Sequence, residues 1–112
     1  MSDGESLRLD KWLWFARMAR TRSLAARLCA AGLVTVSGAV AQKAHHTIRV
    51  GDRISVVQGR ARRHLVVLAL GERRGSATEA RRLYAEPNPP EPLAAPAEEW
   101  VPLFEELGAE EG

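Results

Sequence analysis

Hydrophobic residues near the start of the chain recur with helical spacing. Residues 8–19 place one apolar stripe on a helix at the i, i+3, i+4 and i+7 positions that a buried face requires: Leu9, Trp12, Leu13, Ala16 and Ala19. Thr21 is suited to cap a second helix over residues 22–31, and Gly32 suits the position after its end. Because only a few residues join the two helices, we expect them to pack against each other.

The hydrophobic spacing then changes to the two-residue period of strands. Residues 33–42 predict two short strands about a Ser37-Gly38 turn, and residues 46–59 predict two more about a turn at residues 51–52. Residues 64–70 form a continuous apolar run, which gives the strongest strand prediction. The basic stretch before it, GRARR at residues 59–63, is expected to be a hairpin loop.

The last third of the chain divides into a short helix and a tail. Ser76 and Glu79 have the spacing of a capping box, which predicts a helix as far as about Tyr84. All six prolines lie within residues 87–102, so an extended segment is expected there. The sequence predicts an α+β domain over residues 1–86, with two packed N-terminal helices on a small, mostly antiparallel sheet. A proline-rich acidic tail, partly disordered, follows over residues 87–112.

The formal net charge of +2 conceals a strong asymmetry along the chain. All 16 Lys and Arg residues lie in residues 1–86 beside seven Asp and Glu, whereas residues 87–112 carry seven Glu and no Lys or Arg. All the cations except Lys11 and Lys43 are arginines, whose planar guanidinium suits phosphates and base edges. The basic part therefore predicts a nucleic-acid or anionic membrane-surface partner, and composition does not separate RNA, DNA and lipid.

Several other classes of protein are disfavoured by the sequence. It has no apolar run near the roughly 20 residues of a membrane span and no secretory leader, so we expect a cytoplasmic protein. Cys29 is the single cysteine, which excludes an internal disulfide, and no ligand set for a metal is apparent. Because no glycine-rich phosphate loop, nucleophile elbow or carboxylate pair occurs, we expect neither catalysis nor a cofactor.

The cations of the two predicted helices fall outside the buried stripes. Arg17 projects from the first helix, Arg20 and Arg22 flank the turn, and Arg27 lies on the outer face of the second helix. The start of the second helix also presents backbone N–H groups that have no helical partner, which is a favourable environment for an anion. This arrangement predicts a phosphate-binding face.

The same residues carry a resemblance to a known family. RLDKWL, TRSLAARL, GLVTVSG and VGDRISV occur in the order and spacing of the alpha-L RNA-binding domain, over about residues 8–58. RLDKWLWFAR and RRGSATEARRLYAE resemble the heat shock protein 15 family and extend the match to about residue 86. The resemblance implies a helix pair and a sheet that bind structured RNA. It also implies association with free large ribosomal subunits that carry a stalled nascent chain on tRNA, and recycling of those subunits after heat stress.

The resemblance assigns the RNA-facing residues by their position in the motif: Arg8, Asp10, Lys11, Arg17, Thr21, Arg22, Ser23, Arg27 and Lys43. Asp10 either orients neighbouring arginines or accepts from a base or a 2′-hydroxyl, and an ion pair with Arg8 or Arg17 is the structural alternative. Trp14 either stacks on a base or packs under a neighbouring segment. The family usually continues into a basic C-terminal helix, so the acidic tail predicts weaker binding with a flatter salt dependence.

The function that we expect is therefore non-catalytic binding of large-subunit ribosomal RNA by a monomer, with tRNA or DNA as further partners and no membrane. Two alternatives stay open. The first is a regulator that binds another RNA or DNA through the same residues. The second is a protein-interaction module that acts through the acidic tail, where Trp100, Leu103, Phe104 and Leu107 form a short helical stripe.

Overall fold

The computed structural model describes residues 5–93. The predicted tail stripe from Trp100 to Leu107 lies outside these residues. The described elements are, in chain order, β1 (Leu7–Arg8), α1 (Leu9–Phe15), α2 (Arg22–Ala30), β2 (Val34–Val36), β3 (Ala39–Val40), β4 (Thr47–Ile48), β5 (Arg53–Gln58), β6 (Ala61–Val67), α3 (Ala77–Ala80), the 3-10 helix η2 (Arg81–Leu83), β7 (Tyr84–Ala85) and β8 (Glu91–Pro92).

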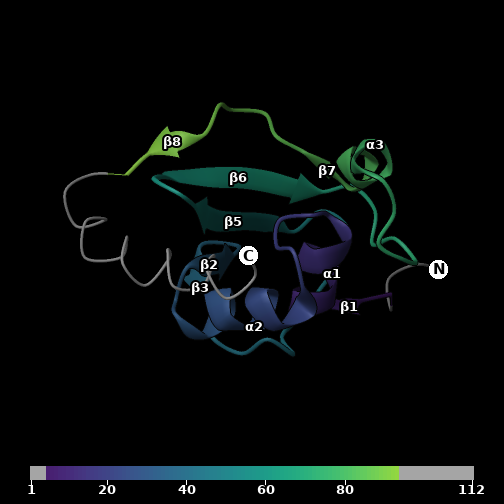
Figure 1. Cartoon of the computed structure of the whole chain (residues 1–112), viewed down its shortest axis with the longest axis horizontal. Helices are drawn as coiled ribbons and strands as arrows, with labels where there is room; N and C mark the ends of the chain where they lie inside the picture. Colours follow the sequence, from purple (N-terminus) through teal and green to yellow (C-terminus); the bar gives the residue numbers. More distant parts are fainter. Residues whose placement is uncertain (1–4, 94–112) are drawn as a thin grey trace.

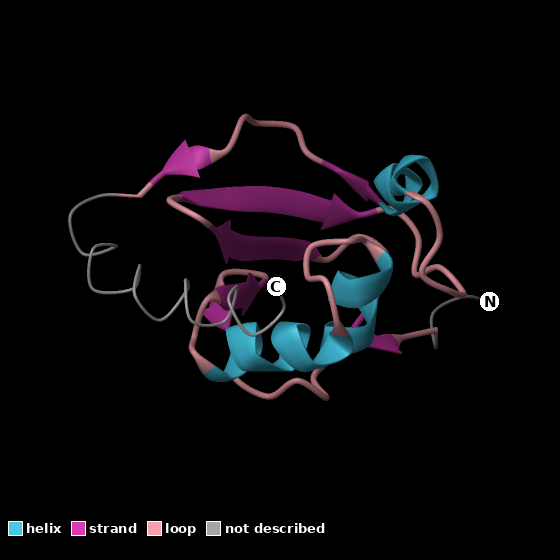
Figure 2. Ribbon diagram, in the orientation of Figure 1, coloured by secondary structure: helices cyan, strands magenta, loops and turns pink. Residues whose placement is uncertain are grey.

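The fold is a helix pair packed on an antiparallel sheet, as the sequence predicts (Figures 1 and 2). The strand order is β3-β2-β5-β6-β7, and β8 pairs with the first two residues of β6, next to the β5–β6 turn. Every strand pair is antiparallel, and the long β5–β6 ladder runs from the pair Arg53↔Val66 to the pair Gln58↔Ala61. The β5–β6 turn therefore lies at the end of the sheet far from α1 (Figure 1).

The core lies between the helix pair and the sheet. Trp12, Leu9 and Leu13 of α1 are completely buried, and they belong to one cluster with Leu28 of α2 and Val56 of β5. The indole N–H of Trp12 donates to the carbonyl oxygen of Ala69 at 3.0 Å, which satisfies the polar end of this buried ring. No helix among residues 5–93 is long and apolar enough to span a bilayer.

The local capping signals are confirmed. The Thr21 hydroxyl accepts from the Leu24 amide at 3.0 Å and caps α2. Ser76 and Glu79 form the reciprocal capping box at the start of α3. Gly32 has a φ of +78° just beyond α2, the left-handed conformation that closes many helices. The Ser37-Gly38 turn joins β2 to β3, as predicted.

The first helix is shorter than the sequence pattern predicts. It ends at Phe15 instead of residue 19, because the chain turns at Arg17, whose φ is +61°. The amide of Met18 donates to the Leu13 carbonyl at 2.9 Å, and the amide of Arg17 donates to the Trp14 carbonyl at 3.1 Å. These two bonds form a Schellman motif, so Ala16 and Ala19 are buried by a turn and not by a continuing helix.

Two strand predictions need correction. Residues 46–59 do not form a hairpin, because β4 pairs with β1 through Leu7↔Ile48 and leaves Val50 58% exposed. GRARR is not a loop either: only Gly59 and Arg60 make the turn, and β6 begins at Ala61. In addition, β6 ends at Val67 and not at residue 70, and Tyr84 starts β7 after the short 3-10 helix.

Candidate nucleic-acid interface

The loop at residues 43–46 is held against the start of α1. The Leu9 amide donates to the His46 carbonyl at 2.7 Å, and the Asp10 amide donates to the Ala44 carbonyl at 3.2 Å. These bonds satisfy two of the amides that a helix start leaves unpaired. They also bring Lys43 and the exposed His45 close to the start of α1, although more than 30 residues separate them along the chain.

Asp10 lies at the centre of this basic region. Its side chain is only 6% exposed, and its two oxygens accept from Nε and Nη2 of Arg8 at 3.1 and 3.0 Å. Nη2 of Arg22, at the start of α2, lies 3.7 Å from Oδ1. The predicted ion pair with Arg8 is therefore confirmed, and Arg22 takes the place expected for Arg17. Both oxygens face arginines, so the geometry favours the orienting role of Asp10 over a contact with RNA.

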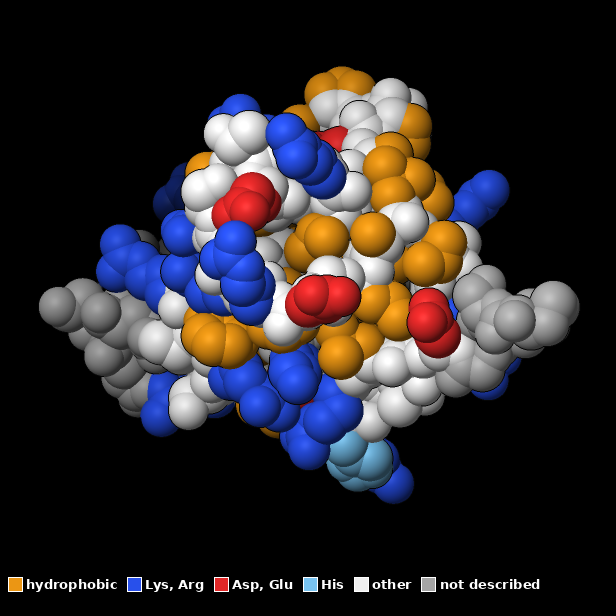
Figure 3. All heavy atoms as spheres, turned by 90° about the vertical axis from the view of Figure 1, so that its right-hand side faces the viewer, with side chains coloured by type: hydrophobic (Ala, Val, Ile, Leu, Met, Phe, Trp, Pro, Cys, Tyr) orange, Lys and Arg blue, Asp and Glu red, His pale blue; other side chains and the backbone are white. Residues whose placement is uncertain are grey.

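The remaining predicted residues of α1 and α2 lie on the outside of the helix pair. Arg22, Ser23 and Arg27 are exposed along α2, and Thr21 is partly exposed at its cap. The ammonium of Lys11 lies 5.7 Å from the centre of the Phe15 ring. The face around α1 and β1 carries a dense group of Lys and Arg side chains with histidine beside them (Figure 3).

Arg17 points elsewhere, toward the loop between β6 and α3. Its Nε donates to the Gly75 carbonyl at 2.8 Å, and Arg74 from the same loop donates its Nε to the Trp14 carbonyl at 3.2 Å. The Arg74 guanidinium also lies over the Trp14 ring, 6.0 Å from its centre. Trp14 thus packs under a neighbouring segment, as one of the two sequence interpretations holds, with the Phe15 ring 5.8 Å away.

Two further cations near this face, the exposed Arg20 and the half-buried Arg74, were not among the predicted site residues. Arg20 lies in the turn between α1 and α2, where the sequence pattern already marks a basic connection. The sequence marks Arg74 only as one of several arginines that could extend the basic surface, and its contact with Trp14, 60 positions away, could not be predicted from spacing.

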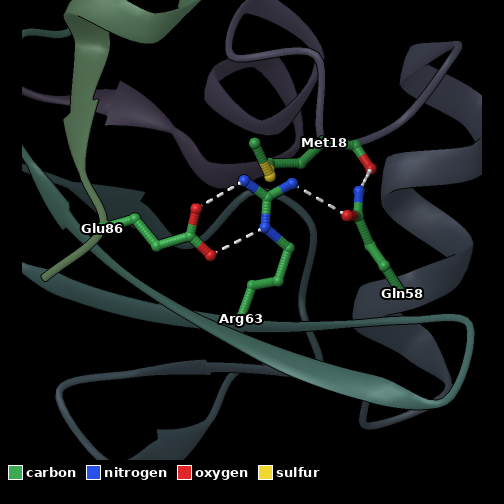
Figure 4. A network of polar contacts seen from close by, with 4 residues as sticks. All are labelled: Met18, Gln58, Arg63 and Glu86. Carbon is green, nitrogen blue, oxygen red and sulfur yellow. Dashed lines mark hydrogen bonds and ion pairs between the residues drawn. The ribbon is translucent and has the colours of Figure 1, made fainter. Parts of the chain in front are cut away.

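A polar network fixes the α1–α2 turn to the sheet (Figure 4). The Gln58 side-chain amide donates to the Met18 carbonyl at 2.7 Å, and Arg63 donates to the Gln58 carbonyl oxygen at 3.0 Å. Glu86 accepts two further bonds from Arg63, at 2.9 and 2.7 Å. These bonds hold the pKa of Glu86 below its usual range and raise that of Arg63. The network holds the turn that carries Arg17 and Arg20.

The side chains of the region that carry charge or a nucleophile can be described one by one. Cys29 is fully buried, and burial together with the negative charge of Asp10 raises the pKa of its thiol to about 12, so it is protonated at neutral pH. Within residues 5–93, no group of three or more His, Cys, Asp and Glu side chains is arranged to hold a metal ion. What the surface offers is arginine and lysine donors around a fixed carboxylate.

Comparison with known proteins finds relatives of the chain that carries this surface. The family model described as "S4 domain" matches residues 7–54. The chain is 37% identical over 82 residues to the heat shock protein 15 homolog of Haemophilus influenzae. The aligned region covers 73% of this chain and 62% of that protein. It is 38% identical over 80 residues to heat shock protein 15 of Escherichia coli K12, covering 71% of this chain and 59% of that protein. The chain thus spans about three fifths of the length of these curated relatives.

A solved structure extends the likeness to three dimensions. The structure of Vibrio cholerae heat shock protein 15, described as trimeric, matches with a TM-score of 0.70 and 38% identity. The match covers 73% of this chain and 82% of that one. The trimer is a property of that protein, and it gives no support to the monomer expected here. This agreement in sequence and fold over four fifths of a solved relative shows that the chain belongs to the heat shock protein 15 family.

Proposed function

We propose that the protein is a non-catalytic RNA-binding protein whose α1–α2 face holds the backbone of structured RNA. The observation that carries the proposal is the arrangement of Arg8, Arg22 and Lys43 around the start of α1. Three separate segments of the chain contribute cations to one surface, and the buried carboxylate of Asp10 orients two of them. Fixed guanidinium groups lose little conformational entropy when they bind phosphates.

Structured RNA is the partner that fits such a surface best. Double-stranded RNA presents phosphates and 2′-hydroxyls across a wide minor groove, and proteins recognise it mainly through its shape. The exposed hydroxyl of Ser23 and the capping hydroxyl of Thr21 lie among the cations and can exchange hydrogen bonds with 2′-hydroxyls. DNA or another RNA is the alternative ligand for the same residues.

The finer part of the proposal follows from the family resemblance. We infer a cytoplasmic role on free large ribosomal subunits, where the protein binds ribosomal RNA and aids the recycling of subunits that stall under heat stress. Membership in the heat shock protein 15 family supports this inference. Because the chain spans only part of its curated relatives, the whole activity is a proposal for this chain.

Co-sedimentation with separated ribosomal subunits over a salt series tests the proposal. We expect selective binding to the large subunit that weakens steeply as salt rises. The double variant Arg22→Gln/Arg27→Gln should make the negative slope of log K against log salt shallower by roughly 1.4–1.8, since each lost phosphate contact accounts for about 0.7–0.9.

The matched control is Arg60→Gln/Arg62→Gln, which removes the same charge at the β5–β6 hairpin, far from α1. Equal losses in both double variants would mean that net charge and not the α1–α2 face drives binding. Binding to free RNA but to neither subunit would retain RNA recognition and contradict the ribosomal role.

A further inference from the structure

Two arginines from distant segments cross over each other at the C-terminal end of α1. Arg17 donates its Nε to the Gly75 carbonyl in the β6–α3 loop, and Arg74 of that loop donates its Nε to the Trp14 carbonyl in α1. The contacts described for these two guanidinium groups as hydrogen-bond donors use Nε alone. The Nη edges are therefore left to a further acceptor.

The two positive charges lie close together without a carboxylate between them. Burial, and after it the positive charge of Arg17, lowers the pKa of Arg74, as expected for two like charges held close together. The nearby Glu79 is engaged by Arg73 at 3.0 Å and by the Ser76 amide at 2.9 Å. Among residues 5–93, no acidic side chain forms an ion pair with Arg17 or Arg74.

The backbone conformation of Arg17 is a further observation on this pair. Both helices of the pair end in a Schellman motif, and the left-handed position is Gly32 after α2 but Arg17 after α1, with φ of +78° and +61°. An L residue with a long side chain is unfavourable at this position, where glycine is free of strain. The chain therefore places a guanidinium at a site where the fold alone favours glycine.

We propose that Arg17 and Arg74 form a clamp for one phosphate group of the bound RNA. The clamp rests on the proposed function and extends it, because Arg74 lies outside the S4 domain match at residues 7–54. A phosphodiester accepts from the Nη edges of both guanidinium groups and neutralises the repulsion between them. The Trp14 ring supports the Arg74 guanidinium from below.

The first test compares RNA binding by Arg17→Asn and Arg74→Gln with binding by Arg60→Gln, which removes one charge at the far hairpin. Asparagine tolerates a positive φ, so Arg17→Asn removes the charge without adding backbone strain. We expect each clamp variant to make the negative slope of log K against log salt shallower by about 0.7–0.9, and Arg60→Gln to leave that slope unchanged.

A purely structural role for the two arginines predicts a different result. Loss of the Nε bonds would then lower the melting temperature while the salt slope, measured well below that temperature, stays at the wild-type value. That outcome, or equal slopes for the clamp variants and Arg60→Gln, would overturn the clamp and leave the proposed function in place.

A second test is independent of RNA. Titration of the wild-type protein with inorganic phosphate, against chloride at equal ionic strength, should shift the Nε–Hε NMR signals of Arg17 and Arg74. The Arg74 shift should disappear in Arg17→Asn. Phosphate-dependent shifts in a protein that binds no RNA would contradict the proposed function and support an anion clamp. Signals that respond identically to phosphate and chloride would overturn the clamp.

Discussion

Asp10 is the residue on which the geometry of the basic face depends. It is buried, and it accepts two hydrogen bonds from Arg8 while Arg22 lies 3.7 Å away. A buried carboxylate among arginines is favourable only while its partners satisfy it, and removing its charge leaves the arginines to repel one another. The Asp10 side chain therefore both stabilises the helix pair and fixes the orientation of its arginine side chains.

We expect Asp10→Asn to lower the free energy of unfolding by about 1–3 kcal/mol, because charged hydrogen bonds to a buried group are lost. Urea denaturation at neutral pH measures this difference. Glu5→Gln removes the same charge from an exposed position and should change stability by less than about 0.5 kcal/mol. Equal effects in the two variants would show that overall charge, and not the bonds to Arg8, accounts for the loss.

Glu86 contributes a pH-dependent part of the stability. Hydrogen bonds from Arg63 hold its pKa below the ordinary value of 4.5, so its ionised form is favoured by folding. This contribution is fully present above pH 4.5 and is lost as the pH falls through the lowered pKa of the folded state. At pH 7, Glu86→Gln should cost about 1.5–3 kcal/mol of unfolding free energy.

The gap between wild type and Glu86→Gln should close as urea denaturation is repeated from pH 7 down to pH 3. Glu72→Gln, at an exposed position in the β6–α3 loop, is the matched control and should track the wild type. A gap that stays constant below pH 4 would show that the packing of Glu86, and not its charge, stabilises the fold.

Among the elements, α2 depends on its cap. The Thr21 hydroxyl accepts the Leu24 amide and keeps its own hydrogen free as a donor. Thr21→Ala should lower the free energy of unfolding by about 1 kcal/mol, and Thr21→Ser should restore most of it. Thermal and urea unfolding compare the three proteins. If the serine variant is as unstable as the alanine variant, the Thr21 methyl group and not the cap is responsible.

The elements also show how far the sequence predicts the fold. Thr21, Gly32 and the Ser76–Glu79 box act on residues three or four positions away, so their patterns identify the helix boundaries. The apolar stripe of α1 predicts its buried face, but the stripe continues past Phe15 because the turn also buries Ala16 and Ala19. Local spacing does not distinguish a helix from a turn that buries the same side.

Long-range pairing is what the sequence did not predict. β4 pairs with β1 across some 40 residues. Arg63 lies in β6, where Glu86 balances its charge and the Gln58 side-chain oxygen accepts a hydrogen bond from it. At the site, the outward position of the α2 cations follows from helix periodicity. The contacts of Asp10 with Arg22 and of Arg74 with Trp14 depend on tertiary packing, which no short motif encodes.

At the scale of the whole molecule, the charge asymmetry predicts weaker attraction of RNA to the basic face than the cations of residues 5–93 alone would give. The described residues end at Leu93, whose amide donates to the Arg60 carbonyl at 3.0 Å and whose side chain packs against the core, so a deletion that begins at residue 94 keeps these contacts. Deleting residues 94–112 removes six glutamates and no Lys or Arg, which raises the formal net charge from +2 to +8.

We expect this deletion to tighten RNA binding below about 0.1 M salt, where charges interact over about 10 Å or more, and to have little effect near 0.5 M. Fluorescence anisotropy with a labelled RNA hairpin, over a salt series, measures the difference. The matched control keeps residues 94–112 and changes the same six glutamates to glutamine.

If the control binds RNA as tightly as the deletion does, the negative charge alone opposes RNA binding. If only the deletion binds more tightly, the segment obstructs the basic face by its presence. Wild-type affinity in both would mean that the fixed cations around Asp10 set the affinity without interference from the rest of the chain.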